Sequence, residues 1–173
     1  PFRDGRRNLL FVGRVTPNKK IEDLLKLLAL LKRQAALPLR LIVAGSTATL
    51  PRYHAALLDL ASRLGLDGRD LAFTGHLPPE ELRAAFAAAD LFVTLSEHEG
   101  FCLQQIESCR FGLPVLAYDA GAVAETLGGA GVLLAGKDLA QAAALAERLL
   151  GDEGLRRGLA AAGRRRFEQY RRE

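Results

Sequence analysis

The sequence predicts an α/β protein with a doubly wound, Rossmann-like sheet of about six mostly parallel strands and helices on both faces. Short apolar runs recur along the whole chain, each too short for a buried helix. Amphipathic segments, most of ten or more residues, lie between these runs. This alternation is typical of βαβ units, in which successive strands run parallel.

Each expected strand is a nearly continuous apolar run, as in sheets that are covered on both faces. The expected strands are residues 9–12, 39–44, 71–73, 91–95, 114–118 and 132–134. The first ends at Gly13 and the second at Gly45, residue types that favour turns.

The expected helices have periodic apolar positions and recognisable ends. They are residues 21–35, 51–64, 78–88, 102–112, 123–127, 139–150 and 153–172. Pro51 and Pro79 suit the first helical turn, where a backbone N–H has no intrahelical partner. Gly65 and Gly112 suit helix ends, because glycine adopts the left-handed conformation required there.

The 173 residues suffice for one domain with a full core, and 49% hydrophobic with 25% charged residues is ordinary for a globular protein. We expect residues 1–173 to be one domain of a longer protein, because the chain begins with Pro1. The net charge of +4 is concentrated at Arg164–Arg166 and Arg171–Arg172. This indicates a solvated last helix, with a membrane-surface patch as the alternative. Aromatic residues do not alternate with the arginines, which argues against nucleic acid.

The two cysteines do not suit a disulfide. Cys102 and Cys109 are seven residues apart in one predicted helix, about 10 Å along its axis. No Cys/His spacing suggests a metal site. A reducing, cytoplasmic setting is therefore expected. The longest apolar run is far shorter than the ~20 residues that span a bilayer.

The segment from Ser96 to Gly112 carries the strongest functional signal. Glu99 lies in a strand-to-helix loop, where parallel sheets bind ligands. The helix that follows begins near Phe101–Leu103 and offers N–H groups to an anion. Glu107 is four residues after Leu103 and so lies on the same helix face. A phosphate held by N–H groups and hydroxyls held by carboxylates indicate a nucleotide sugar.

A basic loop follows the first strand and ends at the same edge of the sheet. Gly13 is followed by Arg14, Lys19 and Lys20. An arginine can bind two phosphate oxygens at once, and a lysine adds a point charge. The alternative is a solvated surface loop. Combined with the helix start near Phe101, the loop favours a diphosphate.

Other interpretations of the acidic and histidine residues remain open. Glu99 can cap the helix, and Glu107 can pair with Arg110. The two carboxylates also suit a glycosidase, although hydroxyl recognition fits a phosphate-binding loop better. His76 follows the third strand and is placed to contact a base or phosphate, and His98 adjoins Glu99. Either histidine is equally consistent with a plain surface residue.

Five stretches together resemble one known family. They are FVGRVTPNKK, LIVAGS, LAFTGHLPPEELRAAFAAADLFVTLSEHEGF, EGFCLQQIE and GLPVLAYDAGAVAE, in that order. The chain resembles, from about residue 8 to 170, the carboxyl-terminal, donor-binding domain of retaining family 4 glycosyltransferases, which have the two-domain GT-B fold.

The resemblance implies a role for each matching residue. Arg14 and Lys19 would bind the donor diphosphate and stabilise its departure, and Glu99 would bind hydroxyls of the transferred sugar. These three are the implied catalytic residues. Backbone N–H groups of Gly100, Phe101, Cys102 and Leu103 would hold sugar and phosphate oxygens. Glu107 would accept from the ribose, and the backbone at His76 and Leu77 would flank the base.

The chain also departs from the family's pattern. Lys20 stands where the family usually has glycine, so either Lys19 or Lys20 contacts the phosphate. Cys102 also replaces a common glycine, which would narrow the sugar pocket. Gly121-Ala122 stands where two glycines are usual.

The implied reaction transfers a hexose from GDP-mannose or a UDP-hexose to an acceptor hydroxyl with retention of configuration, in glycan biosynthesis. It needs neither a metal ion nor a cofactor. A glycan or lipid-linked acceptor would bind an amino-terminal domain that is absent here, so this chain alone would not transfer sugar. The expected location is cytoplasmic, with peripheral association of the full-length protein at the inner membrane face left open. The alternatives are a GT-B-type nucleotide-sugar epimerase and a non-catalytic binding module.

Overall fold

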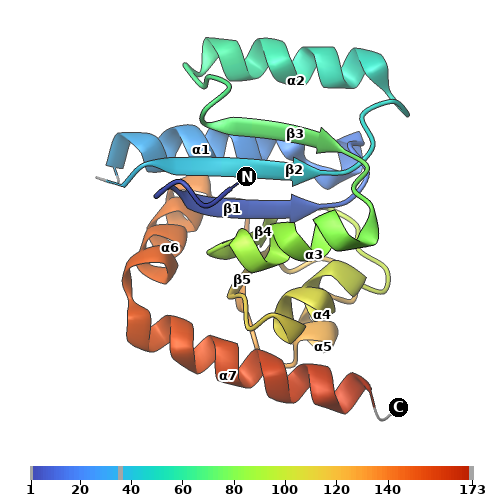
Figure 1. The fold of residues 1–173 in the computed structure, drawn as a ribbon, viewed down its shortest axis with the longest axis vertical. Coiled ribbons are helices and arrows are strands. Elements are labelled where there is room, and N and C mark those ends of the chain that lie inside the picture. Colours follow the sequence, from blue (N-terminus) through green and yellow to red (C-terminus); the bar gives the residue numbers. More distant parts are fainter. Residues whose placement is uncertain (1, 35–36, 172–173) are drawn as a thin grey trace.

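A computed structural model describes residues 2–34 and 37–171. It contains a single six-stranded sheet in the order β3-β2-β1-β4-β5-β6, with every pairing parallel (Figure 1). The strands are β1 (Arg7–Val12), β2 (Leu39–Ala44), β3 (Leu71–Gly75), β4 (Leu91–Thr94), β5 (Val115–Tyr118) and β6 (Val132–Leu134). This is the Rossmann strand order, which confirms the predicted doubly wound fold.

Helices cover both faces of the sheet. They are α1 (Ile21–Gln34), α2 (Pro51–Arg63), α3 (Pro79–Ala88), α4 (Leu103–Arg110), α5 (Val123–Leu127), α6 (Leu139–Gly151) and α7 (Glu153–Tyr170), with a short 3-10 helix η1 (Pro17–Lys19). One core lies between the sheet and α1, α2 and α6, and the other between the sheet and α3, α4 and α5. Helix α7 runs across the bottom of the sheet in Figure 1 and packs on α4.

The central strands contribute side chains to both cores, because alternate side chains along a strand point to opposite faces of the sheet. In β1, Leu9 and Phe11 enter the first core and Leu10 enters the second. In β2, Ile42 packs in the second core while Leu41 packs in the first. This double burial explains why the strands are continuous apolar runs rather than alternating sequences.

Strand ends differ from the prediction where backbone pairing continues past the apolar residues. β1 begins at Arg7, which pairs in register with Leu39, and β3 continues to Gly75, opposite Ala44. The hydrogen-bonded ladder does not require apolar side chains at its ends. Of the predicted helices, the ends at residues 35 and 172 lie outside the described residues.

His54 on α2 is expected from the helical sequence around it to be exposed, and this expectation is wrong. Its side chain is half-buried, and its ring meets Phe73 edge-on with 4.7 Å between the centroids. The turn residues behave as predicted: Gly65 and Gly112 have φ of 72° and 64°. None of the described helices combines the length and apolar character needed to cross a membrane.

Candidate functional site

The loops that follow β1, β2, β3 and β4 meet at the carboxyl edge of the sheet. In a sheet of this order the chain reverses its direction of winding between β1 and β4, and ligands bind in the crevice that results. The basic loop after β1 and the acidic loop after β4 lie on either side of this point. The Glu97 N–H donates to the Asn18 carbonyl at 2.9 Å, which joins the two loops directly.

Lys19 and Glu99, predicted from separate loops, are in contact. Lys19 Nζ lies 2.8 Å from Glu99 Oε1, and the two side chains are only 17% and 12% exposed. The Lys19 ammonium is also 3.5 Å from the His98 carbonyl. The pair therefore places a cation for a phosphate beside a carboxylate that can accept from sugar hydroxyls.

Lys20 faces different carboxylates. Its Nζ lies 3.2 Å from Glu97 Oε2 and 3.9 Å from Glu22 Oε1. The hydrogen bond with Glu97 raises the pKa of Lys20. Lys20 has φ 51° and ψ 47°, the left-handed conformation in which glycine is usual.

A surface cavity of about 260 Å³ opens at the carboxyl ends of β1, β2 and β3, and neither Lys19 nor Glu99 is among its lining residues. Its lining includes Gly13, Arg14, Gly45, Ser46, His76, Leu77 and Gln104. The Arg14 side chain is exposed, and no described carboxylate forms an ion pair with it. A free guanidinium at the wall of a cavity is suited to an anionic ligand.

A second hollow, of about 350 Å³, continues the cavity along α4. Leu82 and Gln104 line both, and Leu103, Glu107 and Arg110 line the second. We call the two together the switch-point groove. Glu107 is 40% exposed and lies 3.6 Å from Arg110, so the structure shows the ion pair that was one of its interpretations. It also confirms that Leu103 and Glu107 share one helix face.

The start of α4 differs from a simple exposed N–H cradle. Cys102 is the N-cap and has φ 53° and ψ 36°. Phe101 and Leu103 are 65% and 55% exposed, whereas Cys102 is 4% exposed. The thiol is turned inward, with Sγ 3.5 Å from the Gly100 carbonyl, so it does not line the groove. Burial raises the pKa of this thiol.

Two glycines, which the sequence analysis did not place in the site, allow the backbones of these loops to approach one another closely. A Cβ on Gly45 would lie 1.7 Å from the Gly13 carbonyl oxygen, and one on Gly121 would lie 2.2 Å from the Glu99 carbonyl oxygen. Only glycine permits either approach. The available signal was the glycine after the second strand and the Gly121-Ala122 pair after the fifth.

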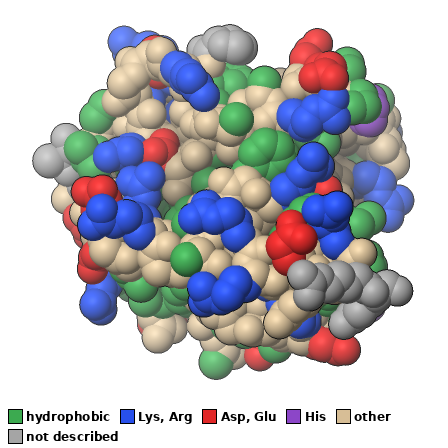
Figure 2. Space-filling view, turned by 60° about the horizontal axis from the view of Figure 1, so that its bottom comes forward, with side chains coloured by type: hydrophobic (Ala, Val, Ile, Leu, Met, Phe, Trp, Pro, Cys, Tyr) green, Lys and Arg blue, Asp and Glu red, His purple; other side chains and the backbone are tan. Residues whose placement is uncertain are grey.

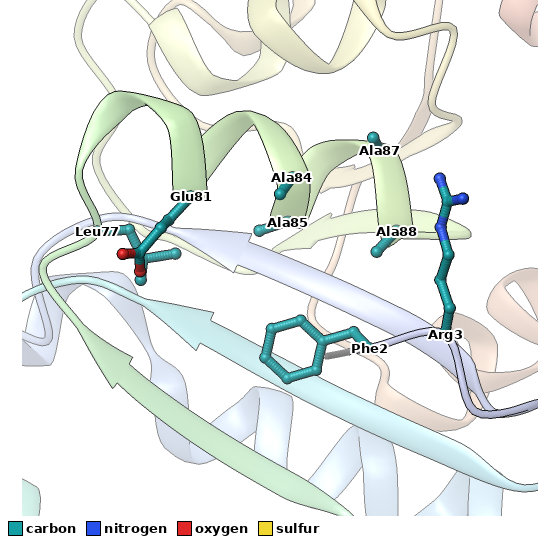
Figure 3. A pocket seen from close by; sticks show the side chains of 8 residues that line it. All are labelled: Phe2, Arg3, Leu77, Glu81, Ala84, Ala85, Ala87 and Ala88. Atoms are coloured by element: carbon teal, nitrogen blue, oxygen red, sulfur yellow. The ribbon is translucent and has the colours of Figure 1, made fainter.

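A third hollow, of about 340 Å³, lies on the other side of α3 (Figure 3). Its lining is mostly apolar, with alanines of α3 itself and Phe2 below the helix in this view, and Leu77 also borders the switch-point groove. Within the described part of the chain, no cluster of three or more His, Cys, Asp and Glu side chains is placed to hold a metal ion.

A doubly wound parallel sheet with cations and carboxylates at its switch point is the architecture of nucleotide-binding α/β domains. The sequence model of the group 1 glycosyl transferases matches residues 1–166, and the chain belongs to this family.

Individual relatives agree with this assignment. The D-inositol 3-phosphate glycosyltransferase of Nocardia farcinica is 37% identical over an alignment of 169 positions, and the match covers 92% of this chain and 37% of that protein. The GDP-mannose-dependent alpha-mannosyltransferase of Mycolicibacterium smegmatis is 35% identical over 118 residues, 68% of this chain and 27% of that protein. The chain thus spans well under half of each relative.

Solved structures show the same fold. HepE of Anabaena, in complex with UDP and glucose, matches with a TM-score of 0.84 at 24% sequence identity. The match covers 95% of this chain and 44% of that one.

Proposed function

We propose that this chain is the donor-binding domain of a retaining glycosyltransferase that transfers a hexose from a nucleoside-diphosphate sugar to an acceptor hydroxyl. The observation that supports it best is the Lys19–Glu99 contact of 2.8 Å at the carboxyl edge of the sheet, the same edge at which Arg14 and Glu107 line the switch-point groove. Cations for a diphosphate and carboxylates for hydroxyls thus come from separate loops to one edge of the sheet.

The proposed pose follows the groove. The diphosphate lies near Arg14, Lys19 and the first residues of α4, Gly100–Leu103. Glu99 accepts from hydroxyls of the sugar, and Glu107 accepts from the ribose. The base lies against His76 and Leu77. Glu107 would then exchange its contact with Arg110 for the ribose hydroxyls.

The chemical step in this proposal is departure of the nucleoside diphosphate as positive charge develops on the sugar. Preorganised charges that face the leaving group lower this barrier. Arg14 and Lys19 supply two cations, and the amino terminus of α4 adds a partial positive charge. We expect no need for a metal ion or cofactor, so transfer by the full-length protein should persist in excess EDTA. Product stereochemistry determined by NMR tests for retention.

GDP-mannose or a UDP-hexose is the proposed donor. One relative is described as GDP-mannose-dependent, and HepE was solved with UDP and glucose. The proposed acceptor is a glycan or a lipid-linked molecule bound by parts of the protein beyond these residues. We therefore expect this chain alone to bind donor without transferring sugar.

Calorimetric titration of the chain with UDP, GDP and ADP, and with their sugars, tests the site. Glu107→Ala should weaken binding of the free nucleoside diphosphate by roughly tenfold, because the variant has no carboxylate to accept hydrogen bonds from the ribose hydroxyls. Glu99→Ala should weaken binding of the intact nucleotide sugar and leave the affinity for the free nucleoside diphosphate unchanged. Glu153→Ala, on exposed α7, serves as the matched control.

Each other outcome has a definite meaning. Equal losses for both ligands in both variants would contradict the pose. No saturable binding of any of these ligands by the wild type would leave only a structural module. Sugar epimerisation by the full-length protein would indicate the epimerase.

We also propose that the full-length protein is cytoplasmic and binds the membrane surface through α7. Exposed arginines on this helix and just after it are Arg157, Arg164, Arg165 and Arg171. Figure 2 shows basic side chains spread over the face that carries α7. Cations near an anionic bilayer gain roughly 1 kcal/mol each. Sedimentation with phosphatidylglycerol vesicles should exceed that with phosphatidylcholine vesicles, and replacing the four arginines with glutamine should abolish the difference.

A further inference from the structure

Glu97 does not line the switch-point groove, yet it connects three loops beside it. One carboxylate oxygen lies 3.2 Å from Lys20 Nζ in the loop after β1, and the other lies 3.0 Å from Lys137 Nζ in the loop after β6. Lys137 Nζ is also 3.9 Å from Asp23 at the start of α1. A single side chain thus links the loops after β1, β4 and β6.

The backbone makes the same connection. The Glu97 N–H donates to the Asn18 carbonyl at 2.9 Å. The segments 18–20 and 97–99 are therefore held together by a main-chain bond and by the Lys20–Glu97 contact. The Lys19–Glu99 pair comes from these same two segments.

The backbone of Lys20 explains why Lys19 and Lys20 face different partners. The Lys20 N–H donates to the Pro17 carbonyl at 3.1 Å, and its carbonyl accepts from the Asp23 N–H at 3.1 Å. Lys20, in the left-handed conformation, is thus the residue at which η1 ends and after which α1 begins. A non-glycine residue in this conformation is strained and persists where surrounding contacts fix it. The contacts of its ammonium with Glu97 and Glu22 are of that kind.

We infer that Lys20 and Glu97 are positioning residues that hold the loop after β1 against the loop after β4. The Lys19–Glu99 pair is then in place before the donor binds. Lys19, and not Lys20, is then the lysine that contacts the diphosphate. This inference rests on the proposed function. It assigns Lys20 a role through its partners instead of a direct contact with phosphate.

The charges around Glu97 are consistent with a permanent bridge. Lys20 and Lys137 face its carboxylate, and Glu22 and Asp23 lie beyond them. Hydrogen bonds from Lys137 and then Lys20 lower the pKa of Glu97, so it stays ionised at neutral pH. The Glu97 side chain is 50% exposed, so each ion pair alone is weak, and the backbone bond is needed to fix the geometry.

The test is the affinity of the free nucleoside diphosphate for five variants of this chain, each first shown to have the thermal stability of the wild type. Lys19→Ala should weaken binding by roughly tenfold or more, because a direct charged contact is lost. Lys20→Gly, which suits the left-handed backbone, and Glu97→Gln should each weaken it by roughly two- to fivefold. The Lys20→Gly, Glu97→Gln double variant should lose no more affinity than the weaker-binding single variant, because both substitutions remove the same Lys20–Glu97 contact. Glu80→Gln, an exposed residue of α3, is the matched control.

Two results would overturn the inference. If Lys20→Gly were as damaging as Lys19→Ala, Lys20 would contact the phosphate. If the Lys20 and Glu97 losses were additive, the two residues would act independently.

Hydrogen exchange of the nucleotide-free protein gives an independent reading. Glu97→Gln should accelerate exchange of the residue 97 amide, which bonds Asn18, while Glu80→Gln should not. Unchanged exchange would refute the bridge even if no nucleotide bound. Failure of the wild type to bind any nucleotide would instead refute the proposed function, and the exchange result would still decide the bridge.

Discussion

The two edges of the sheet use charged residues in different ways. At the amino edge, Asp90 accepts from Arg7 at 2.7 Å and from the Asn8 N–H at 2.9 Å, and Arg156 lies 3.9 Å away. At the carboxyl edge, Arg14 is exposed, with no ion pair to a described carboxylate. Lys20 has φ of 51°, a conformation unusual for a residue other than glycine.

The difference separates stability from binding. Charges at the amino edge are satisfied within the protein, so they fix the ends of strands and helices. The carboxyl edge also has ion pairs, but there Arg14 has no ion pair with a described carboxylate and Lys20 has strained backbone, which are features of sites that bind ligands. Substitutions at the two edges should therefore separate loss of stability from loss of affinity.

The largest effect on stability is expected at Asp90. Asp90→Ala should lower the free energy of unfolding by about 2 to 3 kcal/mol, because it leaves Arg7 and the Asn8 N–H without their acceptor. Nucleotide affinity of the folded protein should not change. Urea denaturation and calorimetric titration measure the two quantities.

Glu99→Ala is the matched variant at the other edge. It should lower stability by less than Asp90→Ala does, because Glu99 is held by one ion pair with Lys19, whereas Asp90 accepts from both Arg7 and the Asn8 N–H. Loss of donor affinity in Asp90→Ala, or a larger stability loss in Glu99→Ala, would remove the distinction between the edges.

The sequence predicts most of the fold because the four central strands, β1, β2, β4 and β5, are buried on both faces, which leaves apolar runs that are easy to recognise. It misses the start of β1 at Arg7, where backbone pairing alone extends the strand. It places Arg14 and Glu99 at one edge, because the loops after parallel strands share an edge. The Lys20–Glu97 contact could not be predicted, since it depends on a left-handed turn that a lysine rarely adopts.

Helix α4 carries the same contrast on a smaller scale, with Cys102 at the site and Cys109 in the interior. Both thiols are free and buried. Burial raises the pKa of Cys109 from 9.0 to about 11. Cys102, the N-cap, thus has strained left-handed backbone, whereas Cys109 lies in a regular turn of the helix.

Cys109 should make stability fall at alkaline pH. Below about pH 9 the thiol is neutral in both states, so its contribution to stability is complete. Above that pH the unfolded thiol ionises first, and stability should fall by about 3 kcal/mol until the folded thiol ionises near pH 11.

Comparing urea denaturation at pH 8 and pH 10.5 tests this expectation. Cys109→Ala should lose less stability between the two pH values than the wild type does. Tyr53 also has a raised pKa but is present in both proteins, so the difference between them isolates Cys109. Parallel pH profiles would show that the Cys109 thiol ionises equally easily in both states.

The smallest predicted effect is a reversal of sign between the two cysteines. At Cys102, with φ of 53°, glycine should be more stable than alanine by about 1 kcal/mol, because alanine keeps the left-handed strain. At Cys109, inside α4, alanine should be more stable than glycine by about 0.5 to 1 kcal/mol, because glycine loses more backbone entropy.

Urea denaturation of the four single variants measures this reversal. Each comparison is between two small residues at one position, so the lost thiol contributes equally to both members of a pair and cancels. If alanine were more stable than glycine at both positions, the left-handed backbone at Cys102 would carry no strain. The contrast between a strained site edge and a relaxed interior would then rest on charge alone.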